Sequence, residues 1–217
     1  MQRYFHTELE ELRTKLILLG EKATEAGRMA VDGFLESDLE LVEKAVKLDD
    51  EIDQLEVEID QASVRYITLR GPVSSDVRLI FVAIKASHDL ERAGDEAHSI
   101  AKKARSILRR EGKVTNTVHI AEMSDLALTL MRDAITCFVE EDLEMARGII
   151  RRDKQIDALN KENFKLLSTA SPESSNDSTT SVETILISKS IERIADHAKN
   201  LAEEVIYLFT GEYAEGS

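Results

Sequence analysis

The stretch that decides the fold is FLESDLELVEKAVKLDDEIDQL, residues 34–55, because it returns as FVEEDLEMARGIIRRDKQIDAL, residues 138–159. The two copies lie 104 positions apart and share nine identical residues in 22. Within the first copy, apolar residues recur at intervals of three and four, which is the period of an α-helix: Leu41, Ala45, Leu48, Ile52 and Leu55. The chain therefore contains a repeated helical unit.

A second recurrence extends the repeat. Glu91-Arg92 and Asp95 return as Glu192-Arg193 and Asp196, 101 positions later. We therefore expect two repeats, residues 1–112 and 113–217, each with three helices. Short connections make successive helices antiparallel neighbours, which favours two tandem three-helix bundles. The expected helices include residues 7–35, 118–139, 142–167 and 182–209, with a loop at 168–181. Between residues 35 and 118, Ser37 or Asp38 caps a second helix that ends near Arg70, and Ser74 or Ser75 caps a third that ends near Glu111.

Composition agrees with an all-α protein and excludes several functions. Hydrophobic residues make up 42% of the 217, and two prolines and nine glycines leave room for long helices. A net charge of -14 argues against binding nucleic acid or an anionic membrane surface. No apolar stretch reaches the ~20 residues that a helix needs to span a membrane, so we expect no direct insertion into one. The N-terminus lacks the apolar core of a signal peptide, so we expect a cytoplasmic protein with Cys137 as a buried thiol.

Four pairs of carboxylates are the candidate functional residues. At a spacing of four, two side chains leave one helix face with Cβ atoms about 5–6 Å apart. Each pair borders an apolar stripe, so antiparallel helices can bring two pairs together. Clustered carboxylates on facing helices hold metal ions in bundle proteins, and oxygen ligands suit Mg²⁺, Ca²⁺, Mn²⁺ and iron. The pairs are Asp49 with Asp53, Glu91 with Asp95, Asp153 with Asp157, and Glu192 with Asp196.

Other interpretations of these carboxylates remain open. Arg92 and Arg193 follow the two glutamates and could neutralise them, which would leave a metal-free helical scaffold. A metal-dependent phosphoester hydrolase is a further alternative, although Walker-type loops and nucleophile motifs are missing. Glu-x-x-His, the di-iron signature, is also missing, which disfavours redox catalysis. His98 and His197 could each reach the edge of a site.

Three stretches make the sequence recognisable: PVSSDVRLI at residues 72–80, DLERAGD at 89–95 and SIERIADHAKNLAEE at 190–204. The doubled (Glu/Asp)-x-x-x-Asp motif in these stretches and in the repeat resembles that of the PhoU family of phosphate-signalling proteins. The resemblance covers nearly the whole chain. Ala93 stands where an isoleucine is typical, which changes packing and leaves the motif intact.

The resemblance implies a function that the spacing alone does not. PhoU-like proteins are cytoplasmic negative regulators of the phosphate-starvation response and are not enzymes. They are thought to link the PstB ATPase of the Pst phosphate transporter to the PhoR sensor kinase. Some bind divalent or trivalent metal ions, including multinuclear iron clusters, so iron, Mn, Zn, Mg and Ca are all candidates. Carried over by position, the ligands would be Asp49, Asp53, Glu91 and Asp95, and in the second repeat Asp153, Asp157, Glu192 and Asp196. We also expect a homodimer through helix faces that carry Ile149, Ile150, Val205, Ile206 and Leu208.

Overall fold

The fold is all-α, as predicted. A computed structural model describes residues 2–169 and 175–212, and these residues form six helices. The expected division after residue 112 lies in the connection between the third and fourth helices. The helices are α1 (Gln2–Glu36), α2 (Leu39–Arg70), α3 (Ser74–Glu111), α4 (Ile120–Glu140), α5 (Leu143–Thr169) and α6 (Ser175–Thr210).

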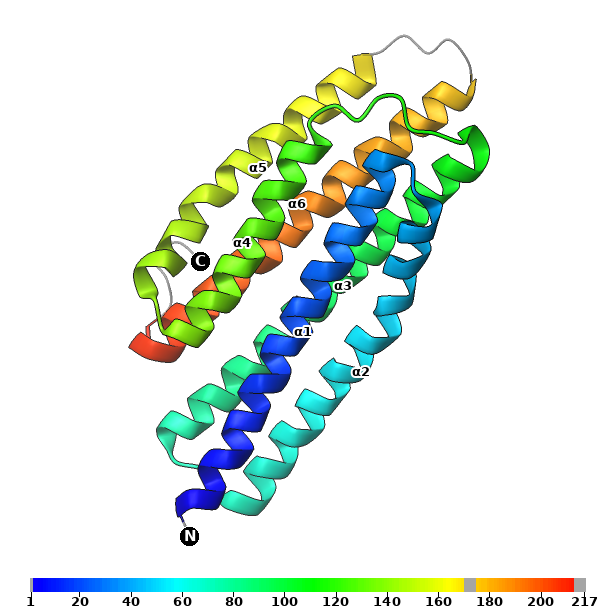
Figure 1. Cartoon of the computed structure of the whole chain (residues 1–217). Coiled ribbons are helices and arrows are strands. Elements are labelled where there is room, and N and C mark those ends of the chain that lie inside the picture. The colour runs from blue at the N-terminus through cyan, green and yellow to red at the C-terminus, as the bar shows by residue number, and fades with distance from the viewer. Residues whose placement is uncertain (1, 170–174, 213–217) are drawn as a thin grey trace.

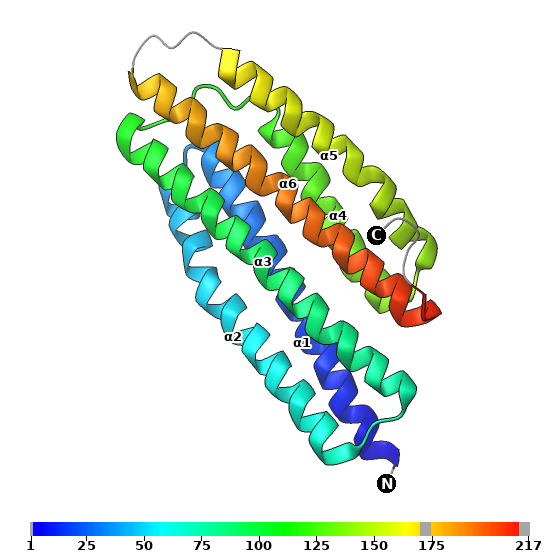
Figure 2. The ribbon, with the colours of Figure 1, turned by 180° about the vertical axis from the view of Figure 1, so that it is seen from behind.

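The helices form two three-helix bundles that lie side by side (Figure 1). In the first bundle α1, α2 and α3 pack against one another, and in the second α4, α5 and α6 do so. The long helices α3 and α6 run antiparallel between the bundles, with α2 on one side and α5 on the other (Figure 2). On the opposite side of the molecule α1 packs against α4. The two repeats therefore meet mainly through their third helices.

Small residues allow the central helices to approach closely. Ala23, Ala26 and Ala30 on α1 are buried, and α3 buries a similar series that includes Ala86, Ala93 and Ala97. Larger side chains such as Phe34 and Phe138 fill the space beyond them and have 0% and 2% exposure. Cys137 is also buried, as predicted, and burial raises the pKa of its thiol to about 12.

The repeated stretch makes the same turn in both bundles. Ser37 and Glu141 occupy equivalent positions and both have a φ of 60°. The aspartate that follows each of them then caps the next helix: Asp38 Oδ1 accepts from the Leu41 N–H at 3.0 Å, and Asp142 Oδ1 accepts from the Met145 N–H at 2.9 Å. This local chemistry explains why the aspartate recurs at this point in the repeat.

Two predictions about helix ends were wrong. Val73 is the N-cap of α3 and makes no side-chain cap hydrogen bond, so neither Ser74 nor Ser75 caps that helix. The predicted loop 168–181 is too long, since α5 continues to Thr169 and α6 already begins at Ser175; its residues 170–174 lie outside the described part of the chain. Arg110 of α3 donates to Thr180 and Glu183 at 2.8 and 2.6 Å, and these contacts stabilise the first turns of α6 despite their low intrinsic helix propensity.

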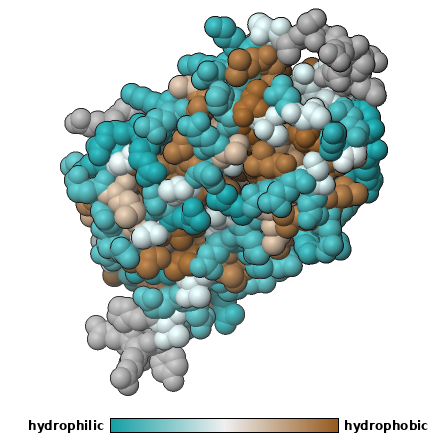
Figure 3. Space-filling view, turned by 45° about the horizontal axis from the view of Figure 1, so that its top comes forward, coloured by the Kyte–Doolittle hydropathy of each residue, from teal (hydrophilic) through white to brown (hydrophobic). Residues whose placement is uncertain are grey.

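The apolar residues expected to support a dimer belong to the core of the chain itself. Ile149 and Val205 are 0% exposed, and Ile206 and Leu208 are also buried. Ile150 packs against the same core and is only partly exposed. The prediction of a dimer interface through these residues is therefore wrong. Figure 3 shows one face of the molecule, where hydrophilic side chains predominate and hydrophobic ones form several separate groups.

Candidate metal centre

The first carboxylate cluster lies between α2 and α3. These helices are antiparallel, and two contacts fix their register: Asp49 with His98, and Glu56 Oε1 with His88 Nδ1 at 3.1 Å. Asp53 on α2 and the pair Glu91 and Asp95 on α3 lie between these contacts, close enough to influence one another's ionisation. The four predicted residues of the first repeat are thus brought together.

Like charges make this first cluster electrostatically unfavourable. Partial burial raises the pKa of Asp53, and the carboxylates of Asp49 and Asp95 raise it further. Burial followed by the charge of Asp95 raises the pKa of Glu91 in the same way. For Asp95 itself, burial and Asp49 raise the pKa, while His98 opposes them. A cation placed among these groups would relieve the repulsion.

The second cluster repeats the arrangement between α5 and α6. Asp153 is 4% exposed, and its Oδ2 lies 3.5 Å from Lys199 Nζ. Burial raises the pKa of Asp153, and Lys199 partly offsets that effect. Burial and the carboxylates of Asp153, Glu192 and Asp157 raise the pKa of Asp196. All four predicted residues of the second repeat therefore also share one site.

Both clusters contain buried polar atoms without a partner, which a cation would satisfy. Asp49 Oδ1, Asp153 Oδ1 and His98 Nε2 are shielded from water and have no hydrogen-bond partner among the described residues. Leaving such an atom unsatisfied costs about 1–3 kcal/mol, and a metal ion would use both carboxylate oxygen and imidazole nitrogen as ligands. Among the side chains that the structure describes, no three from His, Cys, Asp and Glu lie close enough together to hold a metal ion without moving. Without a cation between them, the motif carboxylates repel one another, which is a sufficient reason for this separation.

The α3–α6 contact lies between the two clusters and is polar. Arg193 donates to Glu96 Oε1 at 2.9 Å, and Asp89 Oδ1 contacts both His197 Nδ1 and Asn200 Nδ2 at 2.9 Å. Arg193 therefore neutralises Glu96 rather than Glu192, and His197 belongs to this contact rather than to a carboxylate cluster. A cavity of about 320 Å³ opens here. Its lining includes Asp95 of the first cluster and Asp196 of the second, together with Arg92, Glu96, Arg193 and His197.

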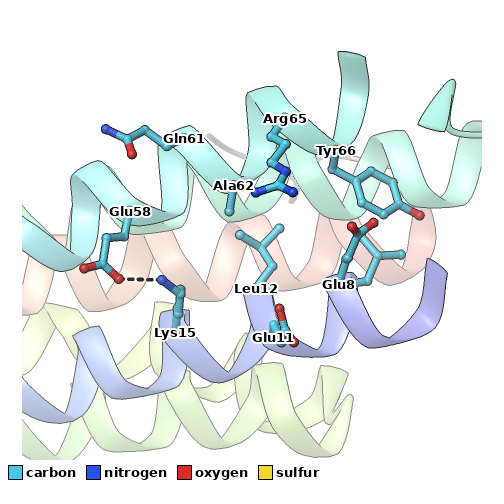
Figure 4. A pocket seen from close by; sticks show the side chains of 10 residues that line it. Glu8, Glu11, Leu12, Lys15, Glu58, Gln61, Ala62, Arg65 and Tyr66 are labelled. Atoms are coloured by element: carbon cyan, nitrogen blue, oxygen red, sulfur yellow. Dashed lines mark hydrogen bonds and ion pairs between the residues drawn. The ribbon is translucent and has the colours of Figure 1, made fainter. Parts of the chain in front are cut away.

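Another cavity, of about 390 Å³, lies between α1 and α2 (Figure 4). The residues around it are Glu8, Leu9, Glu11, Leu12, Lys15, Glu58, Gln61, Ala62, Arg65 and Tyr66. They include none of the eight motif carboxylates, and Lys15 pairs with Glu58 across the cleft. We therefore assign no metal site to this cavity.

Comparison with known proteins gives the chain its family. The family model described as "PhoU domain" matches twice, at residues 16–104 and 120–205. The chain belongs to the PhoU family. Its relatives include proteins named phosphate-specific transport system accessory protein PhoU homolog. The one from Pseudomonas putida is 34% identical over 97% of this chain and 82% of the relative. The one from Aquifex aeolicus is 35% identical over 94% of this chain and 92% of the relative.

Solved PhoU structures have the same fold. The crystal structure of PhoU from Pseudomonas aeruginosa has a TM-score of 0.91 and 33% identity, and the match covers 96% of this chain and all of that one, 100%. The phosphate transport system regulatory protein PhoU from Streptococcus pneumoniae has a TM-score of 0.84 and 29% identity, over 97% and 99% of the two chains. In the described part of the present chain, no helix is both long and apolar enough to span a membrane.

Sequence reasoning missed the cations beside the PhoU motifs. Lys199 contacts Asp153, and Lys189 contacts Glu192. In the first bundle, Glu56 and His88 form an additional contact next to Glu91. The four-residue spacing reveals pairs within one helix only, whereas these contacts with Asp153 and Glu56 cross from one helix to the next. A signal was nevertheless present, because both lysines occupy the positions of histidines in the first repeat.

Proposed function

We propose that this chain is a cytoplasmic negative regulator of phosphate uptake and of the phosphate-starvation response. The observation that carries the proposal is the match of both repeats to the PhoU domain, together with the names of the relatives. Those relatives are called accessory or regulatory proteins of phosphate transport systems. The chain would act by binding rather than by catalysis.

Metal binding at the two clusters is the second part of the proposal. Asp49, Asp53, Glu91 and Asp95 would hold one site, and Asp153, Asp157, Glu192 and Asp196 the other. The bound species would be divalent or trivalent ions, either multinuclear iron or single Mn, Zn, Mg or Ca ions. Bound metal would neutralise the carboxylates and join α2 to α3 and α5 to α6. Support comes from the unpartnered atoms of Asp49, His98 and Asp153 and from the raised carboxyl pKa values.

The partners we propose are the PstB ATPase of the phosphate transporter and a PhoR-type sensor kinase. An adaptor needs a surface whose shape does not fluctuate, because ordering it on binding would weaken the complex. Metal that fixes α2 against α3 and α5 against α6 would hold such a surface. The remaining acidic residues would then attract a basic partner.

The test is a deletion of the gene followed by complementation. Loss of the chain should raise phosphate uptake and the transcription of phosphate-starvation genes in phosphate-rich medium, and the wild-type gene should reverse both. Asp53→Asn with Asp95→Asn should fail to reverse them fully. Glu10→Gln with Glu25→Gln removes the same charge from exposed positions on α1 and should behave as wild type.

Three results would separate this proposal from its alternatives. A deletion that changes neither uptake nor transcription refutes the regulatory role. Full complementation by the Asp53 and Asp95 variant would instead favour a scaffold that functions without metal at the first cluster. Turnover of phosphoesters by the metal-loaded protein, lost in the same variant, would favour the hydrolase.

A further inference from the structure

The two carboxylate clusters have equivalent acids but different neighbours. On α3 the pair Glu91 and Asp95 is flanked by His88 and His98. The equivalent positions on α6, 101 residues later, hold Lys189 and Lys199. On both sides of the same motif, the second repeat therefore has lysine where the first has histidine.

The structure shows that His98 and Lys199 make the same contact. His98 Nδ1 bonds to Asp49 Oδ2, and Lys199 Nζ lies 3.5 Å from Asp153 Oδ2. Asp49 and Asp153 are themselves equivalent in the repeat. The side chains thus reach from the third helix of each bundle to the first motif aspartate on the second helix.

The chemistry of these two contacts is different. An imidazole that bonds to a carboxylate through one nitrogen can ligate a metal with the other, and that carboxylate orients the ring. His98 has this arrangement, since Nδ1 contacts Asp49 and the buried Nε2 has no partner among the described residues. A lysine ammonium has three donors and no lone pair. Lys199 consequently supplies positive charge at the place where an ion would supply it.

Charge in the surrounding residues reinforces the difference. Glu56 adds a carboxylate beside the first cluster, where its charge raises the pKa of Glu91. Its equivalent beside the second cluster, Asn160, carries no charge. Lys189 meanwhile bonds to Glu192 within the second cluster. Lys102 beside Asp95 and its equivalent Glu203 beside the second cluster act in the opposite direction. With two lysines against one, the second cluster still has more of its negative charge offset than the first.

We propose that the two clusters are unequal metal sites. The first binds a transition-metal ion such as Zn²⁺, Fe²⁺ or Mn²⁺ with His98 among its ligands, while Lys199 and Lys189 take the place of metal in the second. A nitrogen ligand favours these ions over Mg²⁺ and Ca²⁺. This inference rests on the metal binding proposed above for the first cluster. For the second cluster it replaces that proposal, because the two lysines there supply the positive charge that metal would otherwise supply.

The experiment exchanges the two side chains. Metal-stripped full-length protein is titrated with Zn²⁺ by calorimetry, and Co²⁺ absorption reports whether nitrogen ligates the ion. Wild type should show one class of tight Zn²⁺ sites. His98→Lys should weaken the Zn²⁺ affinity of that class by about tenfold or more, since changes to the groups around a metal typically cost about 10–100-fold in affinity. Lys199→His should add a second class of comparable affinity. His119→Lys, far from both clusters in the sequence, should bind as wild type does.

Clear results would overturn the inference. Two equal classes of sites in wild type would do so, as would a His98→Lys variant that binds Zn²⁺ as tightly as wild type. Lys199→Met provides a second measurement if Lys199→His does not fold, because losing the ammonium alone should raise Mn²⁺ affinity at the second cluster. An unchanged affinity there contradicts the role of Lys199.

These failures are distinct from a failure of the proposed function. Phosphate uptake in the deletion strain tests the regulatory role without any metal measurement. If uptake responds to the chain but the two clusters titrate alike, only the inequality is wrong. If the clusters titrate unequally but uptake does not respond, the regulatory role is wrong and the site assignment stands.

Discussion

Gly94 allows α2 and α3 to approach closely at the first carboxylate cluster, so its replacement tests how these two helices pack. It lies on α3 between Glu91 and Asp95 and faces Ile52 of α2. A Cβ atom at this position would lie 2.8 Å from Ile52 Cγ2 and 2.9 Å from Ile52 Cδ1. Carbon atoms in ordinary contact are about 3.5–4.0 Å apart. Gly94→Ala therefore requires α2 and α3 to separate.

The magnitude follows from two opposing effects. Ile52 is β-branched and 0% exposed, so its side chain has little freedom to rotate away. Overpacking of this kind costs about 1–3 kcal/mol, and we expect the upper end of that range. Alanine regains about 1 kcal/mol through its better helix propensity. The variant should be less stable by about 2 kcal/mol, which for a chain of this size lowers the Tm by roughly 4–8 °C.

Gly148 is a matched control for this prediction. It lies inside α5, and a Cβ atom added there would meet nothing within 4 Å. Gly148→Ala should therefore gain helix propensity without a clash and be more stable by about 1 kcal/mol. Thermal and urea unfolding of the metal-free protein measure both variants. If Gly94→Ala proves as stable as wild type, the described α2–α3 contact is wrong.

Three further predictions concern other parts of the molecule. Asn163 is 0% exposed and bonds to Ser188 Oγ and to the backbone N–H of His119, both at 3.0 Å. Asn163→Ala should therefore lower the free energy of unfolding, measured in urea, by about 2–3 kcal/mol. A loss below about 0.5 kcal/mol would contradict the role of these bonds. Raised carboxyl pKa values mean that the folded chain binds more protons than the unfolded chain above about pH 4. In chelator, the clusters should therefore make the Tm rise as the pH is lowered from 7.5 to 5, and Asp53→Asn with Asp95→Asn should raise the Tm at pH 7.5 and reduce that pH dependence. Cys137, with a pKa of about 12 and a buried side chain, should react with a thiol reagent only after unfolding in guanidinium; rapid labelling of the native protein would show that α4 opens.

The sequence predicted the helices well where local chemistry determines them. Apolar periodicity located all six, and the aspartate before α2 caps it as expected. The start of α6 was predicted too late, because its first turns depend on contacts with Arg110 of α3 and not on their own propensity. The residues expected in a dimer interface were misplaced for a similar reason. Ile149 and Val205 are apolar whether a partner or the chain's own core covers them, and only the helix arrangement distinguishes the two.

The candidate site was predicted only in part. Four-residue spacing and the repeat were enough to group the eight carboxylates. The contacts of His98 with Asp49 and of Lys199 with Asp153 depend on the register between neighbouring helices, which the spacing within one helix does not determine. The pairing of Arg193 with Glu96 was missed because it crosses between the two bundles.

The antiparallel contact of α3 with α6 joins equivalent helices of the two repeats, which is the form that a two-fold dimer interface takes between separate chains. In such a dimer one gene encodes both subunits, so a substitution in one subunit always appears in the other. A histidine beside one aspartate would then require a histidine beside both. Joining the two copies in one chain removes this constraint, and His98 and Lys199 could diverge while the contact between the halves was kept.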